Sequence, residues 1–188
     1  MKELSLNILD ITENSVKAKA SLTKIEITED GGSLVITVTD DGTGMTKETL
    51  NAVTNPFYTT RTTRKVGLGI PLFKAAAEQT GGKIEINSHH ISEFPDSHGT
   101  RISASFDKTH IDCPPLGDVI STVVTLIQGH PDTDFLFIHR IDGFEISLDT
   151  REMRAILDGV ALNSFEVLEW VEDNLSEQYL LSRENSNQ

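Results

Sequence analysis

The chain has 188 residues, of which 37% are apolar, and this length suits one large or two small globular domains. No apolar run approaches the ~20 residues of a membrane-spanning helix, and the N-terminus lacks the apolar stretch of a signal peptide, so we expect a cytoplasmic protein without a membrane partner. The single cysteine, Cys113, excludes an internal disulfide, and the net charge of −13 argues against nucleic acid as the main partner.

The charge is unevenly spread along the chain. The first 106 residues carry 11 Lys and Arg against 13 Asp and Glu, whereas the rest carries 5 against 16. This asymmetry, with a linker indicated at Pro114-Pro115, predicts a domain at residues 1–108, a small acidic α+β module at 116–181 and a disordered tail at 182–188. The acidic part is either a solubilising surface or a docking surface for a basic protein partner.

Hydrophobic periodicity predicts the elements of the first half in order. Leu4, Ile8 and Ile11 recur at helical spacing, which predicts a helix at 4–18. Strands at 23–29 and 33–39 flank a Gly-Gly turn and predict a hairpin. The same patterns predict a helix at 46–53, a polar loop at 55–65, a helix at 68–80, and strands at 83–88 and 100–106. This order predicts an α/β two-layer sandwich with helices on one face of a mixed sheet.

The second half begins with an ambiguous segment at 116–128, whose apolar spacing fits a helix although its β-branched residues also suit a strand; we favour the helix. Strands at 135–141 and 144–148 flank Asp142-Gly143, a strong hairpin signal. Two further helices are expected, with apolar faces formed by Met153, Ile156, Leu157 and Val160, and by Phe165, Leu168, Val171 and Leu175.

Four short motifs follow one another in the first half: Asp10-x-x-x-Asn14, Asp40-Asp41-Gly42-Thr43-Gly44, Gly67-Leu68-Gly69 and Gly99-Thr100. In this order and spacing they resemble the ATP-binding domain shared by sensor histidine kinases, type II topoisomerases, the ninety-kilodalton heat-shock chaperones and the mismatch-repair ATPases. The resemblance covers roughly residues 1–107 and implies ATP and Mg²⁺ as cofactors. The remainder of the chain matches no family that we can name.

The first motif supplies candidates for the metal ligand and the catalytic base. Asp10 and Asn14 are four residues apart, so they share one face of the expected helix. The amide oxygen of Asn14 suits Mg²⁺, and the resemblance implies that Asn14 holds the metal and that Lys17 meets a phosphate. Family members that hydrolyse ATP usually have Glu at position 10. The shorter Asp10 predicts a weak catalytic base, hence slow turnover or binding with little hydrolysis.

The second motif concerns the base of the nucleotide. A carboxylate accepts a hydrogen bond from an exocyclic amine, and the resemblance implies that Asp40 recognises the adenine of ATP. Gly42 and Gly44 would let the backbone pass close to the base because they lack a Cβ. The alternative is an ordinary Asp-Gly turn after a strand.

The remaining motifs concern the phosphates. Residues 55–61 resemble the lid of histidine kinases, and Arg61, Arg64 or Lys65 could bring positive charge to the phosphates. Gly67, Leu68 and Gly69 precede a helix, whose free N–H groups and dipole favour an anion. Thr100 begins the strand predicted at 100–106, and its role can equally be structural or a contact with the nucleotide.

Two functions fit these motifs. The first is a stand-alone ATP-binding regulatory protein, a histidine- or serine-kinase-like enzyme or a slow ATPase that acts on or with a protein partner docked on the acidic module. The second is a non-catalytic nucleotide sensor in which ATP orders the lid and switches a binding surface. Only nine residues precede Asp10, so we expect no upstream phospho-accepting helices and no complete sensor kinase acting on itself. The oligomeric state stays open.

Overall fold

A computed structural model describes residues 3–54 and 68–186, and in this part of the chain six strands form one mixed sheet in the order β3-β4-β2-β1-β5-β6. The strands are β1 (Leu22–Asp30), β2 (Ser33–Asp40), β3 (Ile84–His89), β4 (Gly99–Asp107), β5 (Asp134–Ile141) and β6 (Phe144–Asp149). The helices are α1 (Leu4–Lys17), α2 (Lys47–Thr54), α3 (Gly69–Gln79), α4 (Val119–Gly129), α5 (Thr150–Leu157) and α6 (Phe165–Ser186).

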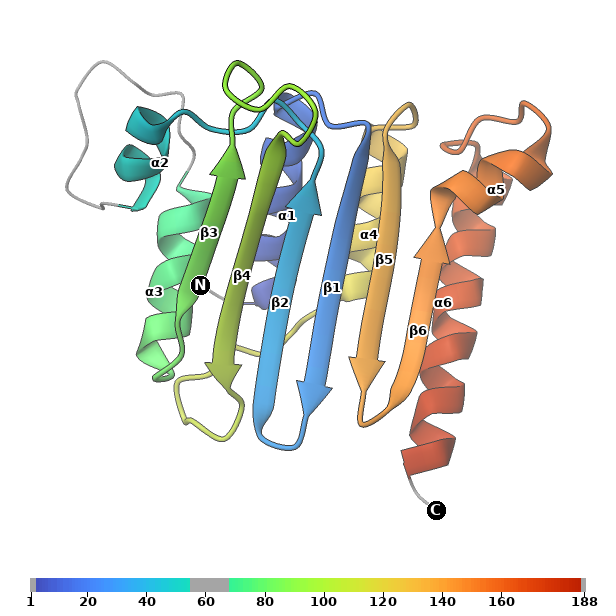
Figure 1. The fold of residues 1–188 in the computed structure, drawn as a ribbon. Helices are drawn as coiled ribbons and strands as arrows, with labels where there is room; N and C mark the ends of the chain where they lie inside the picture. Colours follow the sequence, from blue (N-terminus) through green and yellow to red (C-terminus); the bar gives the residue numbers. More distant parts are fainter. Residues whose placement is uncertain (1–2, 55–67, 187–188) are drawn as a thin grey trace.

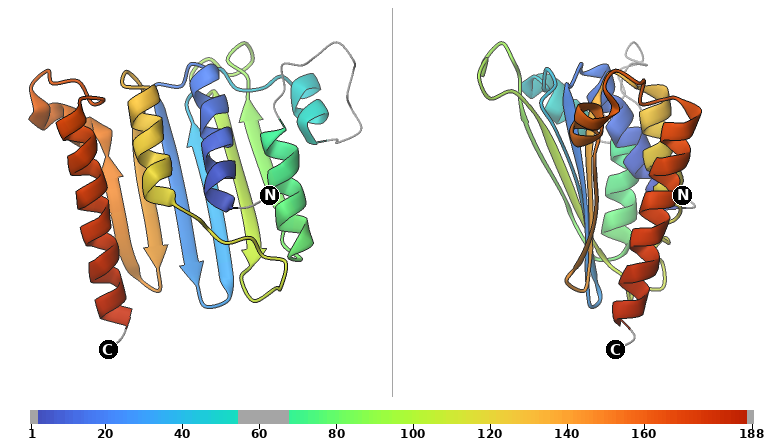
Figure 2. Two further views of the ribbon diagram at one scale, coloured as in Figure 1. Left: turned by 180° about the vertical axis from the view of Figure 1, so that it is seen from behind. Right: turned by 90° about the vertical axis from the view of Figure 1, so that its right-hand side faces the viewer.

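The helices cover one face of this sheet, which confirms the predicted two-layer arrangement (Figures 1 and 2). The left view of Figure 2 shows α3, α1, α4 and α6 side by side in front of the strands, with α2 at one end. The ambiguous segment at 116–128 is helical from Val119 onward, as favoured. Helix α4 begins after Asp118, whose Oδ1 accepts the Ser121 N–H at 2.8 Å. The predicted loop at 55–65 lies outside the described residues.

Helix α1 lies at the centre of the core. Leu4, Ile8 and Ile11 are buried on the face that the sequence predicts, where α1 packs between α3 and α4 and against β1 and β2. The alternating residues of the strands, such as Ile25 and Ile27 of β1, supply the other side of this core. This packing fixes α1 against the end of β2, where Asp40 lies.

The acidic C-terminal segment continues the same sheet. Strand β5 pairs parallel with β1, with Ile25 opposite Phe137, and β6 pairs antiparallel with β5. The predicted division into residues 1–108 and 116–181 stays a prediction. In the structure the two segments share hydrogen-bonded strands and one cluster of buried side chains.

The last two helices depart from the sequence-based expectation. Asp158 takes a left-handed conformation with φ of 45° directly after α5, so the helix ends before Val160. Ile156, inside α5, and Val160 are both exposed rather than buried. Helix α6 buries Val171 and Leu175 and continues to Ser186, five residues into the segment that we expected to be disordered. It persists there because packing continues as far as Ser182, which is buried.

Within residues 3–54 and 68–186, no helix combines the length and the apolar character needed to cross a bilayer.

Candidate functional site

A cavity of about 160 Å³ lies where β2 ends and β4 begins, between α1, α2, the start of α3 and the sheet. Figure 1 shows these segments together at one end of the molecule. Four of the residues that the motifs single out line this cavity: Asn14, Asp40, Gly44 and Thr100. The fold therefore brings together residues from three of the four motifs.

The Asp40 carboxyl group lines the cavity and accepts hydrogen bonds at both of its oxygens. Its Oδ2 accepts the Ser15 hydroxyl at 2.7 Å, and its Oδ1 accepts the Gly42 N–H at 2.9 Å. Burial raises the pKa of the Asp40 carboxyl, although hydrogen bonds from Ser15, Gly42 and the Thr100 backbone oppose the rise. Two donors from different elements thus fix the carboxyl group at the cavity wall.

The neighbouring Asp41 has a different task. Its Oδ1 accepts the Ser21 N–H at 2.7 Å and the Leu22 N–H at 2.9 Å, so it holds the start of β1. Partial burial raises its pKa, but the hydrogen bonds from Leu22 and Ser21 outweigh this and the pKa of Asp41 is lowered. Of the two adjacent carboxylates, only Asp40 lines the cavity.

Gly42 and Gly44 allow the loop backbone to approach neighbouring backbone atoms closely. Gly44 has φ of 68°, and a Cβ there would collide with the carbonyl oxygen of His89. A Cβ on Gly42 would lie 2.9 Å from the Ala18 carbonyl oxygen, where Thr43 N–H already donates a hydrogen bond. Gly42 therefore packs the loop on α1, whereas Gly44 both packs against β3 and lines the cavity.

The residues of the first motif separate in the structure. Asn14 is half-buried and lines the cavity, whereas Lys17 is exposed and its Nζ lies 4.0 Å from Glu13 Oε2. Lys17 is not among the described residues that line the cavity. The expected phosphate contact of Lys17 stays a prediction.

The first and third motifs meet beside the cavity. Gly69 is buried at the start of α3, and a Cβ there would lie 3.0 Å from the Asp10 Cβ. Asp10 is exposed, and Leu68, which precedes α3, is 72% exposed. The exposed carboxylate of Asp10 thus stands next to the N-terminus of a helix.

Thr100 ties the last motif to this site. Its hydroxyl lies 2.8 Å from Ser88 Oγ, and β4 places it directly opposite Asp40 in the sheet. The predicted phosphate-side residues Arg61, Arg64, Lys65 and Gly67 lie outside the described residues.

Several cavity residues escaped the motif search because they carry no motif signal. The apolar ones are Ile11, Ala18, Met45, Val53, Ile70 and Ile102, and the polar ones are Ser15 and Thr49. For Ser15 a signal existed, since it continues the helical spacing of Ile8 and Ile11 and is therefore placed on the buried face of α1.

The donor set fits magnesium bound together with a nucleotide. Among the described residues, no group of three or more His, Cys, Asp or Glu could hold a metal ion. Mg²⁺ commonly takes only one or two protein oxygens and completes its shell with phosphate and water. The Asn14 side chain in the cavity wall meets that requirement for the metal. The Asp40 carboxyl in the same wall is an acceptor for the exocyclic amine of adenine.

Comparison with known families and curated proteins agrees with this geometry. The family model described as "Histidine kinase-, DNA gyrase B-, and HSP90-like ATPase" matches residues 2–110. Sporulation kinase C of Bacillus subtilis is 30% identical over 90 residues, which are 47% of this chain and 20% of that protein. Sensor histidine kinase ZraS of Escherichia coli is 32% identical over 83 residues, 43% of this chain and 18% of that protein. The match thus spans a fifth or less of these relatives.

Solved structures extend the likeness of fold. The Aquifex aeolicus MutL ATPase domain complexed with ADP superposes with a TM-score of 0.55 at 14% identity, covering 84% of this chain and 70% of that one. The N-terminal domain of a DNA repair protein gives a TM-score of 0.53 at 15% identity, covering 78% and 52%. Because these shares exceed residues 2–110, the likeness of fold includes part of the C-terminal segment.

Proposed function

The chain belongs to the family of histidine kinase-, DNA gyrase B- and HSP90-like ATPases, and on that premise we propose that it is a Mg-ATP-binding regulatory protein that acts with a protein partner. The observation that carries the proposal is the Asp40 carboxyl, held at the cavity wall by Ser15 and Gly42. A fixed acceptor among apolar side chains suits a purine with an exocyclic amine.

The cavity corresponds to the base-binding end of the site. Its volume of about 160 Å³ is below the ~300–1,000 Å³ typical of small-molecule sites. The phosphates then extend past Asn14 toward Gly69, where the backbone N–H groups at the start of α3 favour an anion. Asn14 would hold the magnesium ion that accompanies the nucleotide.

Asp10 decides between an enzyme and a sensor. Bound Mg-ATP supplies the phosphoryl group, and Asp10, exposed beside Gly69, would take the proton from an attacking water or partner side chain. In this reading the protein is a kinase or slow ATPase. The shorter carboxylate favours the second candidate, a non-catalytic ATP sensor or adaptor whose lid switches a partner-binding surface.

The kinase reading draws support from the relatives, which are named as sporulation and sensor histidine kinases. The matched segment is a small part of each of them, so the phosphoacceptor belongs to the proposal. The acidic C-terminal segment is the surface that we assign to the protein partner, because its 16 Asp and Glu against 5 Lys and Arg disfavour phosphate-rich partners.

Titration calorimetry with Mg-ATP and Mg-GTP tests the nucleotide site. We expect the parent to prefer ATP, Asp40→Asn to weaken ATP binding at least about tenfold, and Asn14→Ala to abolish the Mg²⁺-dependent part. Asp41→Asn is the matched control, because the adjacent Asp41 carboxylate binds the backbone of Ser21 and Leu22. This substitution should leave ATP affinity unchanged. If Asp40→Asn and Asn14→Ala bind like the parent, the assignment is wrong.

A further inference from the structure

An apolar groove of about 600 Å³ lies between α5 and α6, far in sequence from the nucleotide motifs. Met153, Ile156, Leu157 and Val160 line one side, and Val167 and Trp170 line the other. Three of these side chains are largely open to solvent: Ile156 is 82% exposed, Val160 55% and Trp170 52%. Such a cluster of exposed apolar side chains marks an interaction surface.

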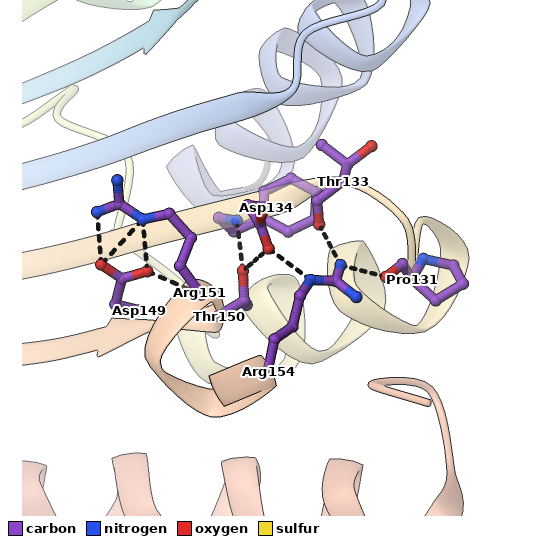
Figure 3. Close-up of polar contacts among 8 residues, drawn as sticks. Pro131, Thr133, Asp134, Asp149, Thr150, Arg151 and Arg154 are labelled. Atoms are coloured by element: carbon purple, nitrogen blue, oxygen red, sulfur yellow. Dashed lines mark hydrogen bonds and ion pairs between the residues drawn. The ribbon is translucent and has the colours of Figure 1, made fainter. Parts of the chain in front are cut away.

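The groove is preformed because polar contacts fix α5 on its other side (Figure 3). Arg154 Nε donates to Asp134 Oδ1 at 2.8 Å, and the same guanidinium donates to the Pro131 carbonyl oxygen. The Thr150 hydroxyl donates to Asp134 Oδ1 at 2.9 Å and accepts the Phe135 N–H at 2.8 Å. An ordered wall reduces the conformational entropy lost on binding.

Glu166 lines the groove and belongs to an acidic stripe of α6. Glu166, Trp170, Asp173 and Glu177 recur at i, i+4, i+7 and i+11, so three carboxylates share the exposed stripe of α6 that carries the tryptophan. In the described part of the chain, none of these three carboxylates forms an ion pair.

The cations of α5 are already engaged. Arg151 is paired with Asp149 and Arg154 with Asp134, so neither offsets the charge of the α6 stripe. The groove therefore combines apolar walls with uncompensated negative charge.

We propose that this groove binds an amphipathic helix of a partner protein, with apolar residues at i, i+3, i+4 and i+7 and with Lys or Arg beside them. Helix-in-groove recognition uses that spacing, and the acidic stripe attracts the basic flanks. A second copy of this chain is disfavoured, because it would bring two acidic α6 stripes together. The inference names the partner chemistry of the proposed function, and it does not depend on nucleotide binding.

Trp170 is the only tryptophan of the chain, so its fluorescence reports the groove directly. The probe is a synthetic helical peptide of about 18 residues with Leu on one face and Lys elsewhere, and its matched control carries Glu in place of Lys. We expect the basic peptide to shift Trp170 emission to the blue and to protect it from acrylamide. Binding should weaken at high salt, and the acidic peptide should give no shift.

Two isoleucine variants distinguish binding in the groove from nonspecific hydrophobic binding. Ile156→Ser removes a groove wall, whereas Ile111→Ser removes an apolar side chain that is 95% exposed and lies outside the groove. We expect Ile156→Ser to bind the peptide about tenfold more weakly and Ile111→Ser to bind it like the parent. Mg-ATP affinity should be unchanged in both. Equal binding by both variants or by the acidic peptide, or a parent dimer that Ile156→Ser dissociates, would overturn the proposal.

Discussion

Glu29 and His139 stand 110 positions apart in the chain, and Glu29 Oε1 lies 3.0 Å from His139 Nε2 in the structure. Because a carboxylate only accepts, Nε2–H of His139 donates to Glu29. In that tautomer, Nδ1 accepts a hydrogen bond from the Tyr179 hydroxyl, 2.7 Å away. Lys108 forms a further ion pair with Glu29. This network joins β1, β5 and α6, and with them the N-terminal part of the chain and its acidic C-terminal part.

Removing the imidazole should destabilise the whole sheet. His139 is buried, so His139→Ala leaves a cavity and two polar groups without their partner. We expect a loss of about 3 kcal/mol in the free energy of unfolding, measured by urea denaturation. His110→Ala, at an exposed histidine, should change stability by less than about 0.5 kcal/mol. Equal stability of the two variants would show that the network contributes little.

Acid should weaken this network in a defined window. The hydrogen bond from His139 lowers the pKa of Glu29 from 4.5 to about 2, with Lys108 adding to the effect against partial burial. Since the unfolded chain binds the proton first, the stabilisation is complete above pH 4.5 and is lost as the pH falls toward 2. Glu29→Gln should therefore flatten the fall in urea midpoint over this range. Parallel pH profiles of parent and variant would contradict the assignment.

Gly44 should tolerate no side chain. Gly44→Ala combines a φ of 68° with a collision against the His89 carbonyl, so we expect a loss of more than about 2 kcal/mol and weaker ATP binding. Gly31 is the control, because its φ is 53° but no atom lies within 4 Å of the added Cβ. Gly31→Ala should cost about 1 kcal/mol and leave ATP affinity intact. Identical thermal shifts for the two would argue against close packing at Gly44.

Ser15 should support nucleotide affinity although no motif contains it. Ser15→Ala removes one donor to Asp40, and we expect ATP to bind about five-fold more weakly, as the loss of one hydrogen bond of about 1 kcal/mol implies. Ser103→Ala, which removes a hydroxyl bonded to Thr37 on the sheet, should bind ATP like the parent. Calorimetry decides, and an unchanged affinity for Ser15→Ala would remove it from the site.

Position 10 should separate the enzyme from the sensor. Asp10→Glu lengthens the carboxylate by one methylene, and we expect phosphate release to rise at least about tenfold in a coupled assay. Asp10→Asn should keep ATP binding and lose any turnover of the parent. Clear turnover in the parent that Asp10→Glu fails to raise would show that Asp10 is already an adequate base, and would favour the enzyme.

Local sequence determined most of the elements and the site motifs of this protein. The period of Leu4, Ile8 and Ile11 fixes the buried face of α1, and Asp142-Gly143 fixes the turn between β5 and β6. These signals act within one turn or one hairpin, so they can be read without tertiary structure. For the same reason Asp40 and Asn14 could be singled out from motifs alone.

The tertiary structure alone decided how these elements combine. The parallel pairing of β5 with β1 and the contact of Glu29 with His139 join residues about 110 positions apart, and no local pattern encodes such a register. The exposed apolar face of α5 is a second case, because a helical period marks an apolar stripe but not what covers it. Burial depends on neighbours that are distant in sequence, and only the folded chain supplies them.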